Sequence, residues 1–233
     1  MTLVIACETI KEEVLYAADK VKCQFPILWM PSSLHKFPNK LQRQLQEQIN
    51  SSECENAENI LLLFGYCGNA VLGLSSKDAC LIIPKMDDCV SVLLGGNERR
   101  NDLSKEGCAY YLTKGWMNSD SGIATEYKRC LMKHGYEKSN MVFNVMLKGY
   151  KSLDVINTGV DKLCDVVAAV QEFAGILELD CKVVDGTLDV LYKALSGQWD
   201  EDDFVILEPG EKVKFEHFGY NIPQPKMQDV ISI

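Results

Sequence analysis

The chain has 233 residues and a formal net charge of −9, which is enough length to bury a substantial core in one large α/β domain or two smaller ones. Hydrophobic residues make up 47% of the sequence and charged residues 24%, as in ordinary globular proteins. The acidic balance repels phosphate backbones and anionic lipids, so we expect neither a nucleic acid nor a membrane as a partner.

The N-terminus, MTLVIACETIKEEV, has no basic region and no long apolar segment, and it predicts no secretory signal. The longest apolar run, ILLLFGYCGNAVLGL, is interrupted by glycine and asparagine and is too short to span a bilayer. We therefore expect a cytoplasmic protein. Its ten cysteines should stay reduced there, which suggests an anaerobic host. The sequence has no CxxC pair, which argues against a zinc ribbon or a thioredoxin-like redox motif.

Seven apolar segments along the chain predict β-strands. Most are continuous apolar runs, the pattern of strands covered on both faces in a parallel sheet. The predicted strands are residues 2–7, 26–31, 59–65, 79–84, 108–113, 152–156 and 203–208.

Amphipathic segments alternate with these strands and predict helices. The predicted helices are residues 8–21, 37–50, 122–135 and 160–177. Pro38 suits the first turn of the second helix. The alternation predicts an α/β fold with a doubly wound, mostly parallel, Rossmann-like sheet.

The domain division is predicted from the same pattern. We expect residues 1–140 to form an α/β domain that carries the functional site. Residues 141–210 should form a smaller α/β unit of the same or a second domain, and residues 211–233 an irregular C-terminal tail.

Four residues of metal-ligand type follow the ends of the first four predicted strands. Cys7 closes the first strand and His35 lies just beyond the second. Cys67 follows the third strand, and Cys89 begins the segment after the fourth. Parallel sheets bind ligands outside the carboxyl ends of their strands. Three cysteines and a histidine suit tetrahedral zinc, and three cysteines also suit an iron–sulfur cluster with one iron left open. We therefore predict a shared metal site.

The alternative is that each of these cysteines only fills the core, since free cysteine is among the most buried residue types. Cys89 has an additional argument for a site. Asp87 or Asp88 can cap the following helix, which leaves Cys89 in its first turn. A helix N-terminus favours thiolate and nearby carboxylates oppose it. A metal cation would resolve this conflict, so we predict Asp88 beside the ligands or as an alternative ligand.

Seven further residues near strand ends are candidates for lining a pocket. They are Asn69, Lys85, Tyr111, Lys114, Trp116, Thr158 and Gly159. The turn at Thr158 and Gly159 could bind an anion through its backbone amides, or simply begin a helix. Aromatic strand residues such as Tyr111 are more often part of the core. The segment LLGGNERR lacks the glycine spacing of nucleotide-binding loops.

Seven blocks of sequence carry a family resemblance. They are IACETIKEEV, MPSSLHKFPNKLQRQLQEQI, LLLFGYCGNAVLGL, LIIPKMDDCVSVLLGG, YYLTKGWM, VINTG and DDFVILEPGEKV. Together they resemble the domain of unknown function 1638 family over nearly the whole chain. The family pattern includes the cysteines and the histidine matched by Cys7, Cys67, Cys89 and His35. Relatives often have a longer basic and aromatic stretch where this chain has NERRNDLSKEG.

The resemblance implies a biological setting and no settled activity. Members are typical of methanogens and anaerobic bacteria and resemble, in setting, the accessory proteins of corrinoid-dependent methyl transfer. We therefore expect a zinc- or iron–sulfur-binding protein of anaerobic one-carbon metabolism. The implied partner is a corrinoid protein or methyltransferase that supplies the corrinoid, with a small-molecule thiol or methyl donor as ligand. A non-catalytic carrier or chaperone of metal or corrinoid is the alternative, and an α/β protein without metal is a third. Catalysis and oligomeric state stay open.

Overall fold

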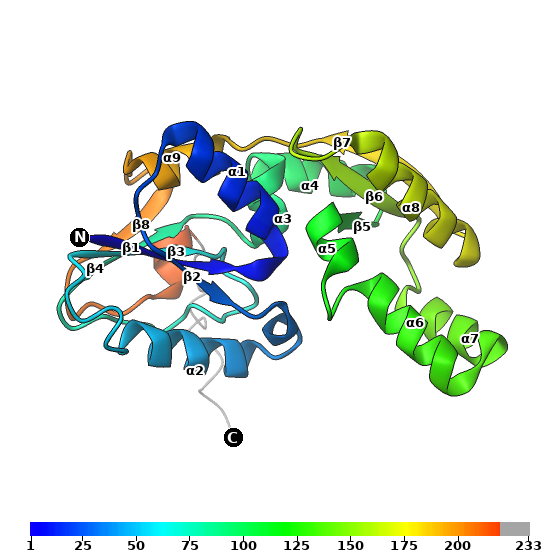
Figure 1. Cartoon of the computed structure of the whole chain (residues 1–233), viewed down its shortest axis with the longest axis horizontal. Helices are drawn as coiled ribbons and strands as arrows, with labels where there is room; N and C mark the ends of the chain where they lie inside the picture. The colour runs from blue at the N-terminus through cyan, green and yellow to red at the C-terminus, as the bar shows by residue number, and fades with distance from the viewer. Residues whose placement is uncertain (220–233) are drawn as a thin grey trace, which may run out of the picture.

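The computed structural model describes residues 1–219, which form two β-sheets covered by helices (Figure 1). The first sheet has the order β2-β1-β3-β4-β8 and is parallel except for β8, which runs antiparallel to β4. Its strands are β1 (Thr2–Cys7), β2 (Ile27–Met30), β3 (Asn59–Leu63), β4 (Cys80–Pro84) and β8 (Phe204–Leu207). The second sheet is parallel and consists of β5 (Ala109–Leu112), β6 (Ser152–Asn157) and β7 (Asp180–Asp185).

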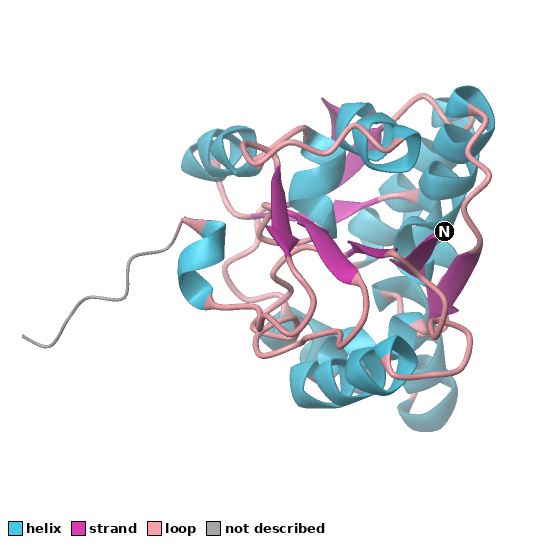
Figure 2. Cartoon of the chain, turned by 90° about the vertical axis from the view of Figure 1, so that its left-hand side faces the viewer, coloured by secondary structure: helices cyan, strands magenta, loops and turns pink. Residues whose placement is uncertain are grey.

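Helices lie on both sides of the first sheet (Figure 2). On one side are α1 (Lys11–Val21), α3 (Cys89–Leu94) and α9 (Asp189–Ser196), and on the other is α2 (Pro38–Ile49). The continuous apolar runs of the strands are needed because each face must be buried. In β1, for example, Ile5 faces the core under α2 and Val4 faces the core under α1. The predicted doubly wound, mostly parallel α/β fold is therefore confirmed.

The remaining helices surround the second sheet and the sheet edges. They are α4 (Asn97–Glu106), α5 (Lys114–Asn118), α6 (Ile123–His134), α7 (Tyr136–Met146) and α8 (Leu163–Ile176), with 3₁₀ turns η1 (Glu8–Ile10), η2 (Ser32–Lys36) and η3 (Phe215–Phe218). None of the helices within residues 1–219 has both the length and the apolar character to cross a membrane.

The seven predicted strands are all present, with ends that differ by two residues or fewer. Strand β7 was not predicted from the sequence, because this edge strand is mostly exposed and reads DCKVVD. Helices α4, α5, α7 and α9 were not predicted either, and α7 spans the predicted domain boundary. The domain division stays a prediction. The chain enters the second sheet at β5 and returns to the first at β8.

Part of the predicted irregular tail, residues 220–233, lies outside the described residues. The turn η3 occupies part of the remainder, residues 211–219.

A close backbone contact joins the segments that follow β3 and β4. Tyr66 N donates to Met86 O at 2.7 Å and Cys67 N to Asp87 O at 2.8 Å. A Cβ atom on Gly65 would lie 2.5 Å from the backbone N and Cα of Asp88. Only glycine fits here, because both opposing atoms belong to the backbone and cannot rotate away.

We expect Gly65→Ala to lower the free energy of unfolding by about 1–3 kcal/mol, because the added methyl group forces the two backbone segments apart. Urea denaturation measures the change. Gly175→Ala is the matched control: Gly175 lies in α8 with no atom within 4 Å of an added Cβ. That helix substitution should leave stability unchanged or raise it by up to about 1 kcal/mol. Equal losses in the two variants would contradict the proposed steric role.

Candidate functional site

The four predicted ligand residues lie at the carboxyl edge of the first sheet. Cys7 is the last residue of β1, and His35 lies in η2, directly after β2. Cys67 follows β3, and Cys89 is the first residue of α3, after β4. Because β1 to β4 are parallel neighbours in the sheet, all four residues emerge at the same edge. We call Cys7, His35, Cys67 and Cys89 the thiol cluster.

A hydroxyl group contacts two members of the thiol cluster. Cys7 Sγ lies 3.0 Å from His35 Nε2. Thr9 Oγ1 lies 3.0 Å from Cys7 Sγ and 3.2 Å from His35 Nε2. The Thr9 side chain also lies near the Cys89 thiol and partly offsets the rise that burial causes in the pKa of that thiol. Thr9 was not among the site residues predicted from the sequence. Its position two residues after Cys7, at the end of a buried strand, is the signal that could have identified it.

Cys67 is presented by a short left-handed segment. The φ angles of Cys67, Gly68 and Asn69 are 49°, 62° and 78°. A non-glycine residue in this region costs about 1–2 kcal/mol, and such strain is concentrated at functional sites. The backbone amides of Gly65 and Cys89 lie near the Cys67 sulfur and partly offset the rise that burial causes in the pKa of its thiol. The contact around Gly65 therefore ties Cys67 directly to the start of α3.

The members of the thiol cluster are held in their neutral forms. Burial, with the nearby Cys7 and Asp88, raises the pKa of the Cys67 thiol to about 12. Burial raises the pKa of Cys7, and it raises the pKa of Cys89 still further with the help of the other two thiols. Burial also lowers the pKa of the His35 imidazole. Cys7 and His35 therefore form a neutral thiol–imidazole pair at pH 7, with no thiolate–imidazolium ion pair.

Asp88 caps α3, as the sequence allows, and also forms an ion pair. Its Oδ1 accepts from Ser91 N at 3.0 Å, and its Oδ2 pairs with Arg100 of α4. Arg100 was not identified from the sequence. The neighbouring Asp87 has a buried Oδ1 without a hydrogen-bond partner among residues 1–219. Desolvation and the charge of Asp88 raise the pKa of Asp87, and Arg100 opposes this shift.

The second half of the chain contributes an aromatic neighbour to the thiol cluster. The ring of Trp116, in α5, lies 6.5 Å from the His35 ring with a tilt of 38°. The preceding residue, Gly115, permits this approach, because a Cβ there would lie 2.7 Å from the carbonyl oxygen of Thr9. Helix α5 therefore packs directly on η1, the turn that contains Thr9.

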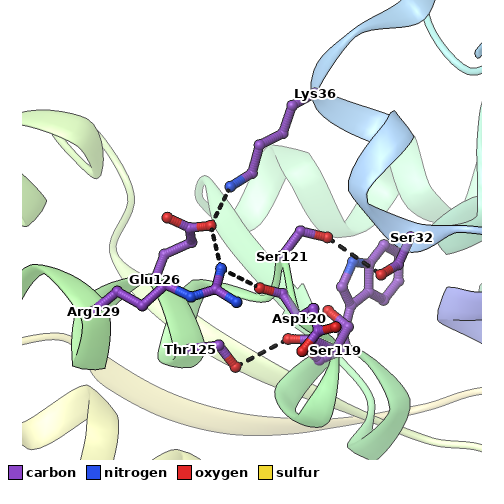
Figure 3. Close-up of polar contacts among 9 residues, drawn as sticks. Ser32, Lys36, Ser119, Asp120, Ser121, Thr125, Glu126 and Arg129 are labelled. Atoms are coloured by element: carbon purple, nitrogen blue, oxygen red, sulfur yellow. Dashed lines mark hydrogen bonds and ion pairs between the residues drawn. The ribbon is translucent and has the colours of Figure 1, made fainter. Parts of the chain in front are cut away.

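Polar side chains continue this contact beyond Trp116 (Figure 3). Ser121 Oγ donates to Ser32 Oγ at 3.3 Å. Lys36 Nζ lies 3.0 Å from Glu126 Oε1, which Arg129 also contacts at 3.2 Å. Ser32 and Lys36 belong to η2, the turn that carries His35. The segment around α6 therefore holds η2 from the side of the second sheet.

The seven candidate pocket residues fall into separate places. Trp116 lies beside His35, whereas Tyr111 is 8% exposed and belongs to the core. Lys85 donates to the carbonyl oxygen of Glu201, away from the thiol cluster. Asn69 is exposed on the Cys67 segment. The remaining three, Lys114, Thr158 and Gly159, line a different cavity at the ends of β5 and β6.

All ten cysteines are free thiols. Cys54 fills the core under α2, and Cys108 and Cys164 are exposed. Within residues 1–219, no three or more His, Cys, Asp and Glu side chains are arranged tightly enough to hold a metal ion as they stand. The metal site therefore stays a prediction.

The fold and the site together define an α/β protein with two mostly parallel sheets and a cysteine-rich carboxyl edge. Residues 29–195 match the family described as "Protein of unknown function (DUF1638)", and the chain belongs to that family. The matched region contains His35, Cys67 and Cys89, and Cys7 precedes it. No curated protein and no solved structure is significantly similar to this chain.

The neutral thiols should resist alkylation. With a pKa of about 12, Cys67 is thiolate only to about 1 part in 10⁴ at pH 8, so it should react with iodoacetamide at least ~10³-fold more slowly than the exposed Cys164. Mass spectrometry of peptides from chelator-treated, reduced protein measures both rates. Labelling of Cys67 as fast as that of Cys164 would contradict the buried, neutral thiol.

Proposed function

We propose that the thiol cluster binds a thiophilic metal ion, and that zinc suits its donors best. The observation that carries the proposal is the contact of Cys7 and His35 with each other, 3.0 Å between Sγ and Nε2, and with Thr9 Oγ1. The Cys89 thiol lies near the same Thr9 side chain. Cys67 N donates to Asp87 O at 2.8 Å, close to the start of α3, and burial together with the nearby Cys7 raises the pKa of the Cys67 thiol. Three thiols and one imidazole are a common tetrahedral zinc set.

The protonation states favour a metal over a cysteine nucleophile. A nucleophilic cysteine needs a lowered pKa or a neighbouring cation, but burial raises the pKa of Cys7 and lowers that of His35. A neutral imidazole is the form that ligates metal. A cation would displace the thiol protons and offset the cost of burying thiolates.

Binding requires local rearrangement of side chains, since the donors do not yet converge tightly enough. The Cys7 thiol would exchange its contact with Thr9 for a bond to the metal, and the Cys89 thiol would bind the same ion. Thr9 would then orient the ligands from behind. When bound, zinc acts as a Lewis acid that lowers the pKa of a coordinated thiol or water. A small-molecule thiol that accepts a methyl group is the substrate class we propose, in keeping with the corrinoid-linked setting that the family resemblance implies.

A non-catalytic carrier is the second candidate function, and one observation favours it. Large apolar side chains are exposed on both α6 and α7, with Met132 81%, Met141 61% and Val145 71% exposed. Exposed apolar patches of this kind mark interaction sites. In this function the thiol cluster would hold the metal with all ligand positions filled by the protein, and the partner would be a methyltransferase or corrinoid protein.

Substituting one cysteine tests metal binding. Protein purified without oxygen should contain about one zinc ion per chain, and Cys89→Ser should lose it. Cys164→Ser, at an exposed position on α8, should retain it. Elemental analysis measures the metal, and circular dichroism confirms that both variants fold. A brown protein with broad visible absorption would indicate an iron–sulfur cluster in place of zinc. If both variants retain the same amount of metal, Cys89 is not a ligand.

Substituting the histidine separates a closed site from an open one. If His35 supplies the fourth ligand, His35→Ala should weaken zinc affinity roughly 100-fold, because one of four ligands is lost from a binding free energy of ~10–16 kcal/mol. His134→Ala, at the exposed end of α6, is the control and should bind normally. Competition with a chromophoric chelator gives both affinities. An unchanged affinity in His35→Ala would leave three cysteines and an open position, as a catalytic site requires.

A further inference from the structure

A buried carboxyl group lies away from the thiol cluster, on the face of α1 that meets the second sheet. Glu13 is 1% exposed, and its Oε2 has no hydrogen-bond partner within residues 1–219. A buried carboxyl oxygen without a partner is costly. Thr113, which directly follows β5, lies beside the Glu13 carboxyl group and partly offsets the rise that burial causes in the pKa of that group, and Trp116 N donates to the Thr113 hydroxyl.

Glu13 lines a small niche of about 10 Å³ at the carboxyl ends of β5 and β6. Thr113, Asn157 and Thr158 line the same niche and carry oxygen atoms that can accept hydrogen bonds. The volume is close to that of one water-sized group. A single small head group therefore fits beside Glu13.

The niche adjoins a large pocket of about 740 Å³ between α5, α6 and α8, because Lys114, Asp161 and Val166 line both. That volume is typical of small-molecule sites. The walls are largely apolar and aromatic. They include Met117, Tyr127, Leu131, Phe173 and Ile176. A ligand could thus place a small polar head in the niche and an apolar body in the pocket.

The charged residues around the niche determine whether it favours an anionic or a cationic head group. Lys114 is already engaged, 2.8 Å from Asp161 and 3.4 Å from Glu12, so it does not neutralise Glu13 as well. An anion would meet the Glu13 carboxylate. The backbone amide of Gly159, which could have held an anion, donates instead to Asn157 Oδ1 at 3.3 Å. The niche therefore favours a cation with N–H donors.

We propose that Glu13 and the adjoining pocket bind a protonated primary amine with an apolar, preferably aromatic, body. The ammonium group occupies the niche and donates to Glu13 Oε2, and the body lies between α6 and α8. The site is separate from the thiol cluster, and the proposal does not depend on metal binding. Nothing in the family description assigns a ligand to it.

Protonation of Glu13 gives the site a pH dependence. Burial raises the pKa of Glu13 to about 7, its own N–H and the Thr113 hydroxyl oppose the shift, and the charges of Asp161 and Glu12 add to it. Lys114 forms ion pairs with both of those acids. Because an ammonium ion needs the carboxylate form, Glu13 must release its proton on binding below about pH 7. Affinity should therefore rise up to about tenfold per pH unit below that point and level off above it.

Tryptamine is the probe, with its neutral isostere tryptophol and the anion indolepropionate for comparison. Isothermal titration calorimetry on the full chain should show tryptamine binding at least ~10-fold more tightly than either comparison compound at about pH 8. At about pH 6, titrations in two buffers of different ionisation enthalpy should reveal proton release. Equal affinity of the unaltered chain for tryptamine and tryptophol, or no binding of tryptamine, would by itself overturn the proposal.

The isosteric variant Glu13→Gln should lower tryptamine affinity at least ~10-fold at about pH 8 and abolish the pH dependence. Glu12→Gln is the matched control, because the neighbouring Glu12 pairs with Lys114 and does not line the niche. It should bind nearly as well as the unaltered chain. Phe173→Ala should weaken tryptamine and tryptophol together, since it removes part of the apolar wall. Retention of tight, pH-dependent binding in Glu13→Gln would contradict the assignment.

Discussion

The close backbone contact between Gly65 and Asp88 is the constraint on which the thiol cluster depends. It places the left-handed segment of Cys67 against the first turn of α3, so that the backbone amide of Cys89 lies near the Cys67 sulfur. Parallel pairing of β3 with β4 brings the two segments to one edge, and the missing side chain of Gly65 lets them meet. Without this contact, Cys67 and Cys89 would follow neighbouring strands without sharing a site.

A second contact, between η1 and α5, connects the two parts of the chain. Gly115 packs on the carbonyl oxygen of Thr9, and α5 then presents different side chains to two sites. Trp116 lies beside His35 of the thiol cluster, whereas Lys114 and Met117 line the pocket next to Glu13. The carboxyl ends of both sheets therefore contribute to sites on either side of one short helix, in agreement with the general placement of ligands in parallel sheets.

Both proposed sites are governed by the cost of burying charge. In the thiol cluster, burial keeps Cys7, Cys89 and His35 neutral, so a metal cation would be exchanged for protons. In the niche, burial brings the pKa of Glu13 to about 7, so a bound ammonium ion would also displace a proton. Ligand binding at either site should therefore be coupled to proton release. The two sites differ in the cation that displaces the proton, which is a metal ion at the thiol cluster and an ammonium ion at the niche.

The sequence by itself determined the strands of the first sheet and the shared edge of Cys7, His35, Cys67 and Cys89, because continuous apolar runs report burial on both faces and chain order then sets the carboxyl ends. It could not identify β7, whose exposed edge lacks that apolar signal. Only the tertiary structure decided which side chains meet across long stretches of chain. Thr9 became the centre of the thiol cluster, and Glu13 met the ends of β5 and β6. The contact of Glu13 depends on how the two sheets pack, and no local pattern in the sequence encodes that packing.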